Sequence, residues 1–298
     1  MNGFLCLNKP EGLTSFVAAA KCRRLAGAKK SGHTGTLDPM ATGVLVVALG
    51  AATRFIELIP SHEKSYRAAF RLGETTDTLD ITGTVLQTRP VTCGKADVEA
   101  ALERFRGEIL QVPPMYSALQ KDGVRLYALA RQGVEIEREA RPVRISHLSL
   151  AEADENAHTY TVDVTCSAGT YIRSLIADLG EALGCGAVMT ALCRTAAHGL
   201  TLAESYDFYA LEAMAANGTL GATVLPTERL LGLPALTVSE KQAVRFSNGG
   251  ELDLARLQGA ENGGLFSVFS PAGDFLGVGE IEAAVLKVRK TLPKTKEG

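Results

Sequence analysis

The chain has 298 residues, enough for one large domain and a small second one. Apolar residues make up 46% and charged residues 21%, the balance of an ordinary soluble globular protein, and no apolar run reaches the ~18–20 residues that a membrane helix needs. The N-terminus has neither a basic leader nor the long apolar stretch of a signal peptide. We therefore expect no membrane association and a cytoplasmic location.

Metal and cofactor signatures are missing from the sequence. The six cysteines form no CxxC pair, and the five histidines show no HxxxH or HExxH spacing. No segment resembles a Walker loop or an EF-hand. Scattered thiols in a chain without an export signal are expected to be reduced. We predict that the protein uses no metal and no cofactor.

The charge distribution is uneven. The net charge of −2 argues mildly against a nucleic-acid partner, but residues 21–30 hold five basic residues and no acidic one, and the tail at 287–296 holds a second basic cluster. Most runs of like charge indicate only a solvated surface, which is the favoured interpretation of both clusters. Composition and charge alone do not indicate the function.

Periodicity and breaker residues predict the elements in chain order. The first part should contain a strand at 3–7, a helix from Phe16 to Ala26, an irregular segment at 31–43, a strand at 44–49 and a short helix from Arg54 to Ile59. Strands at 64–72 and 84–88 then flank a polar loop at 73–83, and a helix at 96–106 is followed by an irregular segment at 111–119. The last elements of this part are a helix at 126–133, strands around 142–150 and 159–166, and a helix at 169–184. Thr14 or Ser15 can cap the first helix, and Thr170 the last.

After about residue 230, glycines separate short apolar runs, which predicts a small β-rich domain of hairpins. Strands and helices before that point do not alternate regularly as in βαβ units. The expected fold class is therefore α+β, with a mixed, largely antiparallel sheet flanked by helices.

The segment with the clearest chemical content is Gly32-His33-Thr34-Gly35-Thr36-Leu37-Asp38-Pro39. Pro39 favours an extended backbone at Asp38, so the carboxylate tends to project from the loop. The glycines allow a ligand to approach the backbone. From the residues alone, this is either a ligand-facing loop or a turn that the aspartate braces. It is not a phosphate-binding P-loop, because no GK[ST] follows.

The segment 32–45 resembles the signature loop of the TruB family of tRNA pseudouridine synthases, in which the aspartate before the proline is the catalytic nucleophile. Other segments resemble the same family in the same order, so that the resemblance covers about residues 3–200: 8–15, 64–67, 76–83, 113–133 and 166–184. It implies a pseudouridine-synthase domain at 1–230. Residues 231–298 resemble only loosely the small PUA-like RNA-binding domain of bacterial members.

The resemblance implies an isomerase that converts uridine to pseudouridine in the TΨC loop of tRNA, at position 55 of tRNA. The reaction breaks the C1′–N1 bond, turns the uracil over and rejoins it through C5, with no redox step. An ionised Asp38 can attack the sugar carbon or stabilise its cationic character, as in retaining glycosidases. Direct attack and a glycal intermediate both stay open. The base must first be flipped out of the folded RNA.

The resemblance also assigns partners to Asp38. Tyr66 matches the tyrosine that stacks on the flipped uracil and can help to move a proton. Arg173 matches the arginine that pairs with the catalytic aspartate, and its place in the first turn of a helix, where the dipole disfavours a cation, also points to a nearby anion. We expect this ion pair to lower the pKa of Asp38, with burial having no opposing effect.

The other substrate-binding candidates come from the resemblance too. Tyr171 and Leu192 match positions that line the uracil pocket, although ordinary core packing explains Leu192 nearly as well. His33 matches the residue that holds the RNA loop open beside the flipped base. Three further polar residues occupy family positions with weaker arguments: Lys9, Lys64 and Asp80.

Two other functions are weighed against the isomerase. One is a tRNA chaperone whose catalytic turnover is incidental, although family members can combine both activities. The other is a phosphate- or nucleotide-binding hydrolase built on the Gly/Thr loop, which lacks a Walker lysine and a metal set. The expected partner is the T-arm of tRNA, and a monomer is the default oligomeric state.

Overall fold

The computed structural model describes residues 1–60, 63–117, 119–121, 123–257 and 263–293. Its main sheet has nine strands in the order β1-β3-β12-β4-β11-β10-β7, with β2 beside β3 and β13 beside β12. Within this sheet the pair β12–β3 is parallel, and the other pairs are antiparallel. The predicted α+β class with a mixed, largely antiparallel sheet is confirmed.

The large domain contains these elements, in chain order: β1 (Gly3–Lys9), α1 (Ser15–Leu25), β2 (Ser31–His33), β3 (Thr42–Leu49), the 3₁₀ helix η1 (Gly50–Leu58), β4 (Lys64–Leu72), β5 (Glu74–Thr76), β6 (Val85–Thr88), α2 (Lys95–Leu102), η2 (Glu103–Phe105), β7 (Gly107–Gln111), β8 (Gln120–Lys121), β9 (Val124–Arg125), α3 (Leu126–Ala130), β10 (Arg141–Asp154), β11 (Thr159–Cys166), α4 (Ile172–Ala182), β12 (Ala187–Ala197), β13 (Leu200–Thr201), η3 (Leu202–Glu204), α5 (Phe208–Ala216), η4 (Leu220–Thr223) and α6 (Thr227–Leu231).

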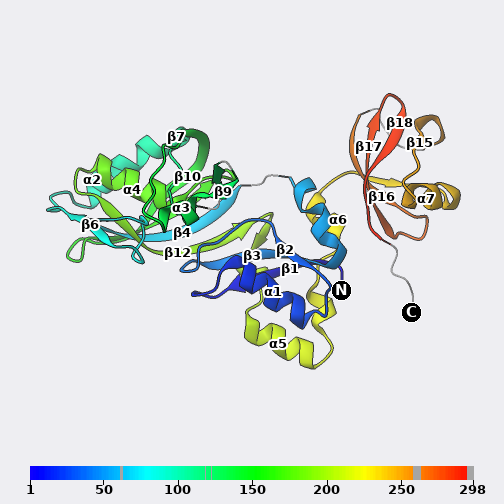
Figure 1. The fold of residues 1–298 in the computed structure, drawn as a ribbon, viewed down its shortest axis with the longest axis horizontal. Helices are drawn as coiled ribbons and strands as arrows, with labels where there is room; N and C mark the ends of the chain where they lie inside the picture. Colours follow the sequence, from blue (N-terminus) through cyan, green and yellow to red (C-terminus); the bar gives the residue numbers. More distant parts are fainter. Residues whose placement is uncertain (61–62, 118, 122, 258–262, 294–298) are drawn as a thin grey trace.

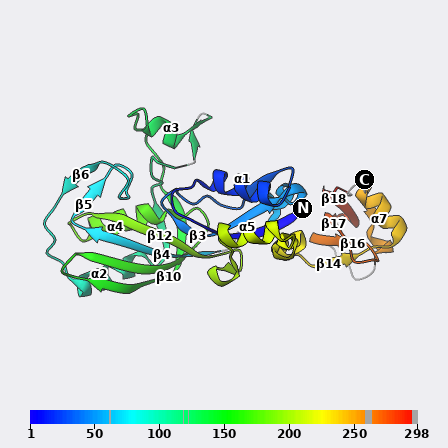
Figure 2. The same cartoon turned by 90° about the horizontal axis from the view of Figure 1, so that it is seen from below.

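One face of the sheet carries the main hydrophobic core. Side chains of α1, α4 and α5 pack there against the alternating inward residues of β1, β3, β4 and β11. The opposite face of β1 and β3 is buried as well, because η1 and α6 cover it. Both faces of these two strands are therefore apolar, which explains why 44–49 is a continuous hydrophobic run. The segment that leads to Asp38 lies beside this rigid pair of strands (Figures 1 and 2).

The C-terminal part forms a five-stranded sheet in the order β14-β16-β17-β18-β15. Its elements are β14 (Ala235–Thr237), α7 (Glu240–Ser247), β15 (Leu252–Asp253), η5 (Leu254–Arg256), β16 (Gly264–Phe269), β17 (Phe275–Glu282) and β18 (Val285–Thr291). The predicted β-rich unit is confirmed, while the helix α7 was not predicted. The boundary at residue 230 stays a prediction. The unit contacts the large domain through Phe275, whose ring centroid lies 5.6 Å from that of Phe55.

Several local predictions were wrong. The segment 31–43 was expected to be irregular, but residues 31–33 pair with β3 as a short strand. The loop at 73–83 contains β5, which pairs with β6. The helices predicted at 96–106 and 126–133 end as α-helices at Leu102 and Ala130. Thr170 does not cap α4: Tyr171 is the N-cap residue, and the Thr170 hydroxyl donates to the Ser167 carbonyl at 2.9 Å.

The central strand β12 was not predicted at all. Two bulges interrupt its pairing with β4, between Met189 and Ala191 and between Arg194 and Ala196. A bulge shifts the alternation of inward and outward side chains by one residue. The period-two pattern that identifies a strand is therefore absent from the sequence of β12, although this strand joins the two halves of the sheet.

The basic tail has partners within the protein. In β18, Lys287 pairs with Glu282, Arg289 with Glu280 and Glu282, and Lys290 with Glu57. These carboxylates neutralise the cations that the sequence offered as a phosphate-binding surface, which weakens that interpretation. Lys294 and Lys296 lie outside the described residues.

The basic segment 21–30 differs from the tail. Arg23, Arg24, Lys29 and Lys30 are exposed at the end of α1 and in the turn after it, and none of them has an ion-pair partner among the described residues. Lys21, by contrast, pairs with Glu212 at 2.8 Å. The cations at the end of α1 and in the turn after it are therefore free to bind an anionic partner, whereas those of β18 are already paired with carboxylates.

Candidate active site

The loop that carries Asp38 runs from β2 to β3 and is fixed by side chains of other elements. The Ser15 hydroxyl, at the start of α1, lies 2.8 Å from the Leu37 amide and 3.0 Å from the Leu37 carbonyl. It accepts from the first and donates to the second. The buried Lys9 ammonium donates to the carbonyls of Pro10, Leu13 and Pro39, the last at 3.2 Å. The residues on both sides of Asp38 are thus held in place.

Asp38 and Arg173 form a two-pronged ion pair. The Arg173 Nε lies 2.9 Å from one carboxylate oxygen of Asp38, and its Nη2 lies 3.2 Å from the other. The planar guanidinium therefore fixes the direction of the carboxylate as well as its distance. The predicted contact is confirmed in its geometry. The Arg173 side chain is 6% exposed and that of Asp38 33% exposed, so the carboxylate is the member of the pair that solvent reaches.

Arg173 is itself positioned by three further contacts. It donates from Nη1 to the Thr78 carbonyl at 2.9 Å and from Nη2 to the Tyr116 carbonyl at 2.7 Å, and Nη1 lies 3.6 Å from Asp80. Asp80 in turn accepts from the Thr78 hydroxyl, the Thr82 amide and the Thr82 hydroxyl. The two carboxylates supply the anions that the first-turn position of Arg173 in α4 requires.

The expectation for the pKa of Asp38 was wrong. Burial of the carboxyl raises its pKa above the ordinary value of 3.8, while Arg173 lowers it and the like charge of Asp80 raises it again. Loss of hydration therefore outweighs the attraction of the guanidinium, because Asp38 lies in a crowded site even though part of its side chain reaches solvent. The ionised form of Asp38 depends on Arg173.

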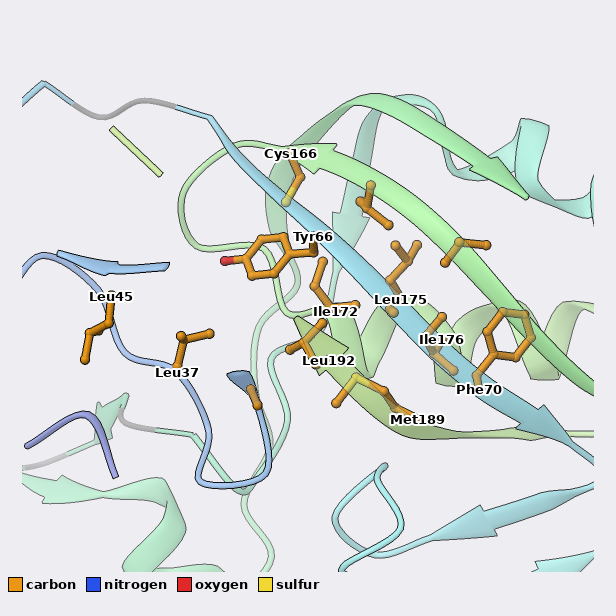
Figure 3. Packing of buried hydrophobic residues seen from close by; sticks show 14 of the residues in the cluster. Leu37, Leu45, Tyr66, Phe70, Cys166, Ile172, Leu175, Ile176, Met189 and Leu192 are labelled. Carbon is orange, nitrogen blue, oxygen red and sulfur yellow. The ribbon is translucent and has the colours of Figure 1, made fainter. Parts of the chain in front are cut away.

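Tyr66 lies on β4 with its ring among apolar side chains. Figure 3 shows its hydroxyl directed away from Phe70 and towards the side where Leu37 lies, with Leu192 next to Ile172 below the ring. Burial raises the pKa of Tyr66, the charge of Arg194 lowers it, and that of Asp38 raises it. The charge of Asp38 therefore acts on the pKa of Tyr66, but with a smaller effect than that of Arg194. Tyr66 and Leu192 are both buried and belong to the main core.

The other predicted polar residues lie around the same loop. His33, in β2, is half-buried, and burial together with the charges of Arg194 and Lys64 lowers its pKa, which favours the neutral imidazole. Burial and Arg194 also lower the pKa of Lys64. A side chain at Gly35 would collide with the Lys64 ammonium, 2.7 Å from the position of its Cβ, so glycine allows this close approach.

Lys9 and Asp80 have contacts that suit support of the site. Every Lys9 contact described above is to a backbone carbonyl, and burial lowers the pKa of Lys9 to about 8 although the nearby Asp38 raises it. Asp80 contacts Arg173 and two threonines, as given above. A direct role of either residue in substrate binding stays a prediction.

Tyr171 borders a cavity of about 180 Å³. Gln111 holds the backbone of Tyr171 from both sides: its amide nitrogen donates to the Tyr171 carbonyl at 3.1 Å, and its oxygen accepts from the Tyr171 amide at 2.8 Å. Arg141 also lines the cavity. These two hydrogen bonds join Tyr171, the N-cap residue of α4, to the end of β7. The strand β7 was not predicted from the sequence.

Three residues of the site had no assigned role in the sequence interpretation: Arg194, Ser15 and Gln111. The sequence indicates Ser15 only as a candidate helix cap, and it places Gln111 only in a segment predicted to be irregular. Arg194 had a recognisable signal, since it is a single cation in the otherwise mainly apolar segment 187–197. A buried charge in such a segment indicates a specific function for its hydrogen bonds.

Two features are absent from the part of the chain that the structure describes: a cluster of metal-ligating side chains and a membrane-spanning helix. No group of three or more His, Cys, Asp or Glu side chains is arranged to hold a metal ion within those ranges. All six cysteines are free thiols. Among the same residues, no helix has the length and apolar character needed to cross a membrane.

Three domain descriptions match the chain. The N-terminal domain of the TruB family pseudouridylate synthases matches residues 23–172, the tRNA pseudouridylate synthase B C-terminal domain matches 173–232, and the C-terminal domain of pseudouridine synthase II TruB matches 234–292.

Curated relatives match over most of their length. The tRNA pseudouridine synthase B of Pseudomonas fluorescens is 45% identical over 285 residues, which cover 94% of this chain and 92% of that protein. The enzyme of the same name from Burkholderia lata is 48% identical over 258 residues, covering 86% and 79%. Among solved structures, a Cbf5–Nop10–Gar1 complex has a chain with a TM-score of 0.73 at 24% identity, covering 98% of this chain and 85% of that one. This last similarity concerns the fold alone.

Proposed function

The chain belongs to the TruB family of pseudouridylate synthases, and from this premise we propose that it isomerises uridine to pseudouridine in the TΨC loop of tRNA, at position 55 of tRNA. The observation that carries the proposal is the two-pronged contact of Arg173 with Asp38, at 2.9 and 3.2 Å. It presents one oriented, partly exposed carboxylate beside a buried tyrosine. The predicted pseudouridine-synthase fold is confirmed by the structural similarity.

The chemistry follows from the position of Asp38. Its carboxylate is held by Arg173 and by the anchored loop, so it can meet the C1′ carbon of a bound nucleotide with little reorganisation. Attack on C1′, or stabilisation of its cationic character, breaks the C1′–N1 bond, and the electron pair leaves with N1 of the uracil. After the uracil has turned over, C5 bonds to C1′, C5 loses its proton and N1 gains one, so that pseudouridine forms without any change in mass. Both direct attack and a glycal intermediate are compatible with this arrangement.

The substrate must reach the site as a flipped nucleotide. A uridine that is stacked inside folded RNA is inaccessible to the carboxylate of Asp38. The uridine must therefore leave its stack, and the protein must hold it by new contacts. Tyr66 supplies an aromatic face for the base, while Leu192 and Tyr171 supply apolar surface. The exposed cations of α1 suit the phosphates of the T-arm. A further role as a tRNA-folding chaperone stays a prediction.

The proposal is tested by nucleoside analysis of a tRNA transcript after incubation with the enzyme. We expect one new nucleoside of the same mass as uridine that co-elutes with pseudouridine, at one equivalent per tRNA. If the protein binds and refolds the transcript but leaves its nucleosides unchanged, the isomerase proposal is wrong and the chaperone remains.

Replacement of Tyr66 separates its ring from its hydroxyl. Tyr66→Phe keeps a stacking surface worth ~1–3 kcal/mol per base, and we expect its tRNA affinity to be close to that of the wild type. Tyr66→Ala loses that surface and should bind and react more weakly. Single-turnover rates of the two variants decide the role of the hydroxyl: full activity of Tyr66→Phe would show that Tyr66 is a stacking surface and takes no part in proton transfer.

We expect the reaction to be insensitive to chelators. The cation beside Asp38 is the Arg173 guanidinium, which already occupies both carboxylate oxygens. Rates on pre-folded tRNA should be equal with and without excess EDTA. Loss of activity that zinc alone restores would contradict the metal-free mechanism, whereas magnesium must be kept constant because tRNA folding uses this ion.

A further inference from the structure

Arg194 is one of the largest fully buried side chains among the described residues. It lies on β12 and is 2% exposed. No carboxylate lies within 4.0 Å of its guanidinium in the described part of the chain. A buried cation without an anion is costly, because the protein must replace the lost hydration with hydrogen bonds. Such a residue is expected where its hydrogen bonds have a function.

The hydrogen bonds of Arg194 end on the loop that carries Asp38. Its Nη2 donates to the Gly35 carbonyl at 3.2 Å and its Nη1 to the Thr36 carbonyl at 3.4 Å. Its Nε donates to the Val44 carbonyl at 2.6 Å, where the loop has entered β3. One rigid guanidinium therefore holds the backbone before and after the catalytic aspartate.

The backbone of Arg194 lies at the junction between the strands of the site. β12 pairs there with β4, with Arg194 opposite Tyr66, and with β3, with Arg194 opposite Gly43. Gly43 has a φ of +98°, and a Cβ at this position would overlap the Arg194 backbone. The strand that carries Tyr66 and the loop that carries Asp38 thus meet at this one residue.

We infer that Arg194 is a positioning residue of the proposed isomerisation: a buried guanidinium that fixes the loop of Asp38 against the strand of Tyr66. It acts through the loop, since its 2% exposure leaves no surface for RNA. The charge of Arg194 also lowers the pKa of Tyr66, consistent with its proximity to the hydroxyl. Misplacement of a reacting group by about 1 Å can cost roughly 100-fold in rate.

The test compares Arg194→Lys with the wild type in single-turnover reactions on tRNA. Lysine keeps the charge but cannot reach three carbonyls with a planar fork. We expect the rate at saturating enzyme to fall more than tenfold, toward roughly 100-fold, while the Kd for tRNA stays within threefold. Arg194→Gln removes the buried charge as well as the fork, so it should fold even if the lysine variant does not, and its rate should fall at least as far.

A matched control accounts for lost stability. Leu102→Ala truncates a buried side chain of α2, a helix whose main contacts are with η2, β10 and α4, and it should lower the melting temperature without changing the rate well below that temperature. An Arg194 variant that is folded and reacts within tenfold of the wild type would overturn the inference. So would a loss that appears only in Kd, or an equal loss of rate in Leu102→Ala.

The inference rests on the proposed function, and the two can fail separately. If the wild-type enzyme does not isomerise uridine in tRNA, the proposed function is wrong. If the wild type is active, the ratio of variant to wild-type rates tests Arg194 alone.

Discussion

Replacement of Asp38 by asparagine is expected to abolish isomerisation and to leave the affinity for tRNA within a few-fold of the wild type. Asparagine keeps the size of the side chain and can still accept one hydrogen bond from Arg173, but it has no charge with which to attack or stabilise the C1′ carbon. Contacts with the phosphate backbone supply most of the RNA affinity, and they are remote from this carboxylate.

The measurement for Asp38→Asn is a single-turnover assay paired with a filter-binding titration of the same tRNA. Purified variant with even one percent of the wild-type rate, after asparagine deamidation has been excluded by mass spectrometry, would contradict the assignment of Asp38 as the nucleophile. Asp163→Asn is the control: this carboxylate pairs with Arg67 on the exposed face of the sheet, at 2.8 Å, and its loss should not affect catalysis.

Replacement of Arg173 is expected to have the second-largest effect. Arg173→Lys retains a cation but not the planar fork that aligns both oxygens of Asp38, so it should lose much of the activity. Arg173→Met should lose nearly all of it. It also leaves the buried Asp80 without a cation, at a cost of up to ~3 kcal/mol in the free energy of unfolding, since hydroxyl and amide donors still satisfy part of that carboxylate. Urea denaturation of the variants measures this cost.

The pH dependence of the rate tests why Arg173 is needed. Burial raises the pKa of Asp38 above 3.8 and Arg173 is the strongest influence that lowers it. Activity requires the ionised carboxylate, so the rate should fall as the pH drops through this raised pKa, at a higher pH than for an ordinary aspartate. Arg173→Lys should hold Asp38 more weakly, so the fall in its residual rate should occur at a still higher pH. If the fall occurs at the same pH as in the wild type, Arg173 orients Asp38 without affecting its ionisation.

The raised pKa of Asp38 also makes the free energy of unfolding depend on pH. Because the folded-state pKa of Asp38 lies above its unfolded value, the folded state binds a proton more tightly there. This contribution to stability is fully present below pH 3.8 and is lost as the pH rises through the folded-state pKa. At neutral pH the ionised Asp38 is therefore a cost to folding, a trade of stability for reactivity that is common at active sites.

The sequence predicted those parts of the site that depend on local chemistry. Pro39 and the glycines around Asp38 indicated an exposed carboxylate on a loop, and the dipole argument for Arg173 required an anion, which the structure provides. The long strand β4 and the amphipathic helix α4 were predicted because their periodicity is regular. These features depend on residues that are close together in the chain.

Features that depend on distant contacts escaped prediction. The bulges of β12 conceal its strand pattern, so the junction at Arg194 could not be predicted from spacing. The sign of the pKa shift of Asp38 depends on how closely the folded chain surrounds the carboxyl, and the sequence indicated only the opposing charge. Likewise, the tail cations were identified, but not the carboxylates of Glu280, Glu282 and Glu57 that neutralise them.

The most direct test of the central claim is carbodiimide mapping of a tRNA transcript, which marks each pseudouridine as a stop to reverse transcriptase. With the wild-type enzyme we predict one new stop, at the uridine of position 55 in the TΨC loop, and none when this uridine is replaced by cytidine. The Asp38→Asn enzyme should give no stop on either transcript. The absence of a stop with the wild type, or stops that persist when position 55 is cytidine, would contradict the account.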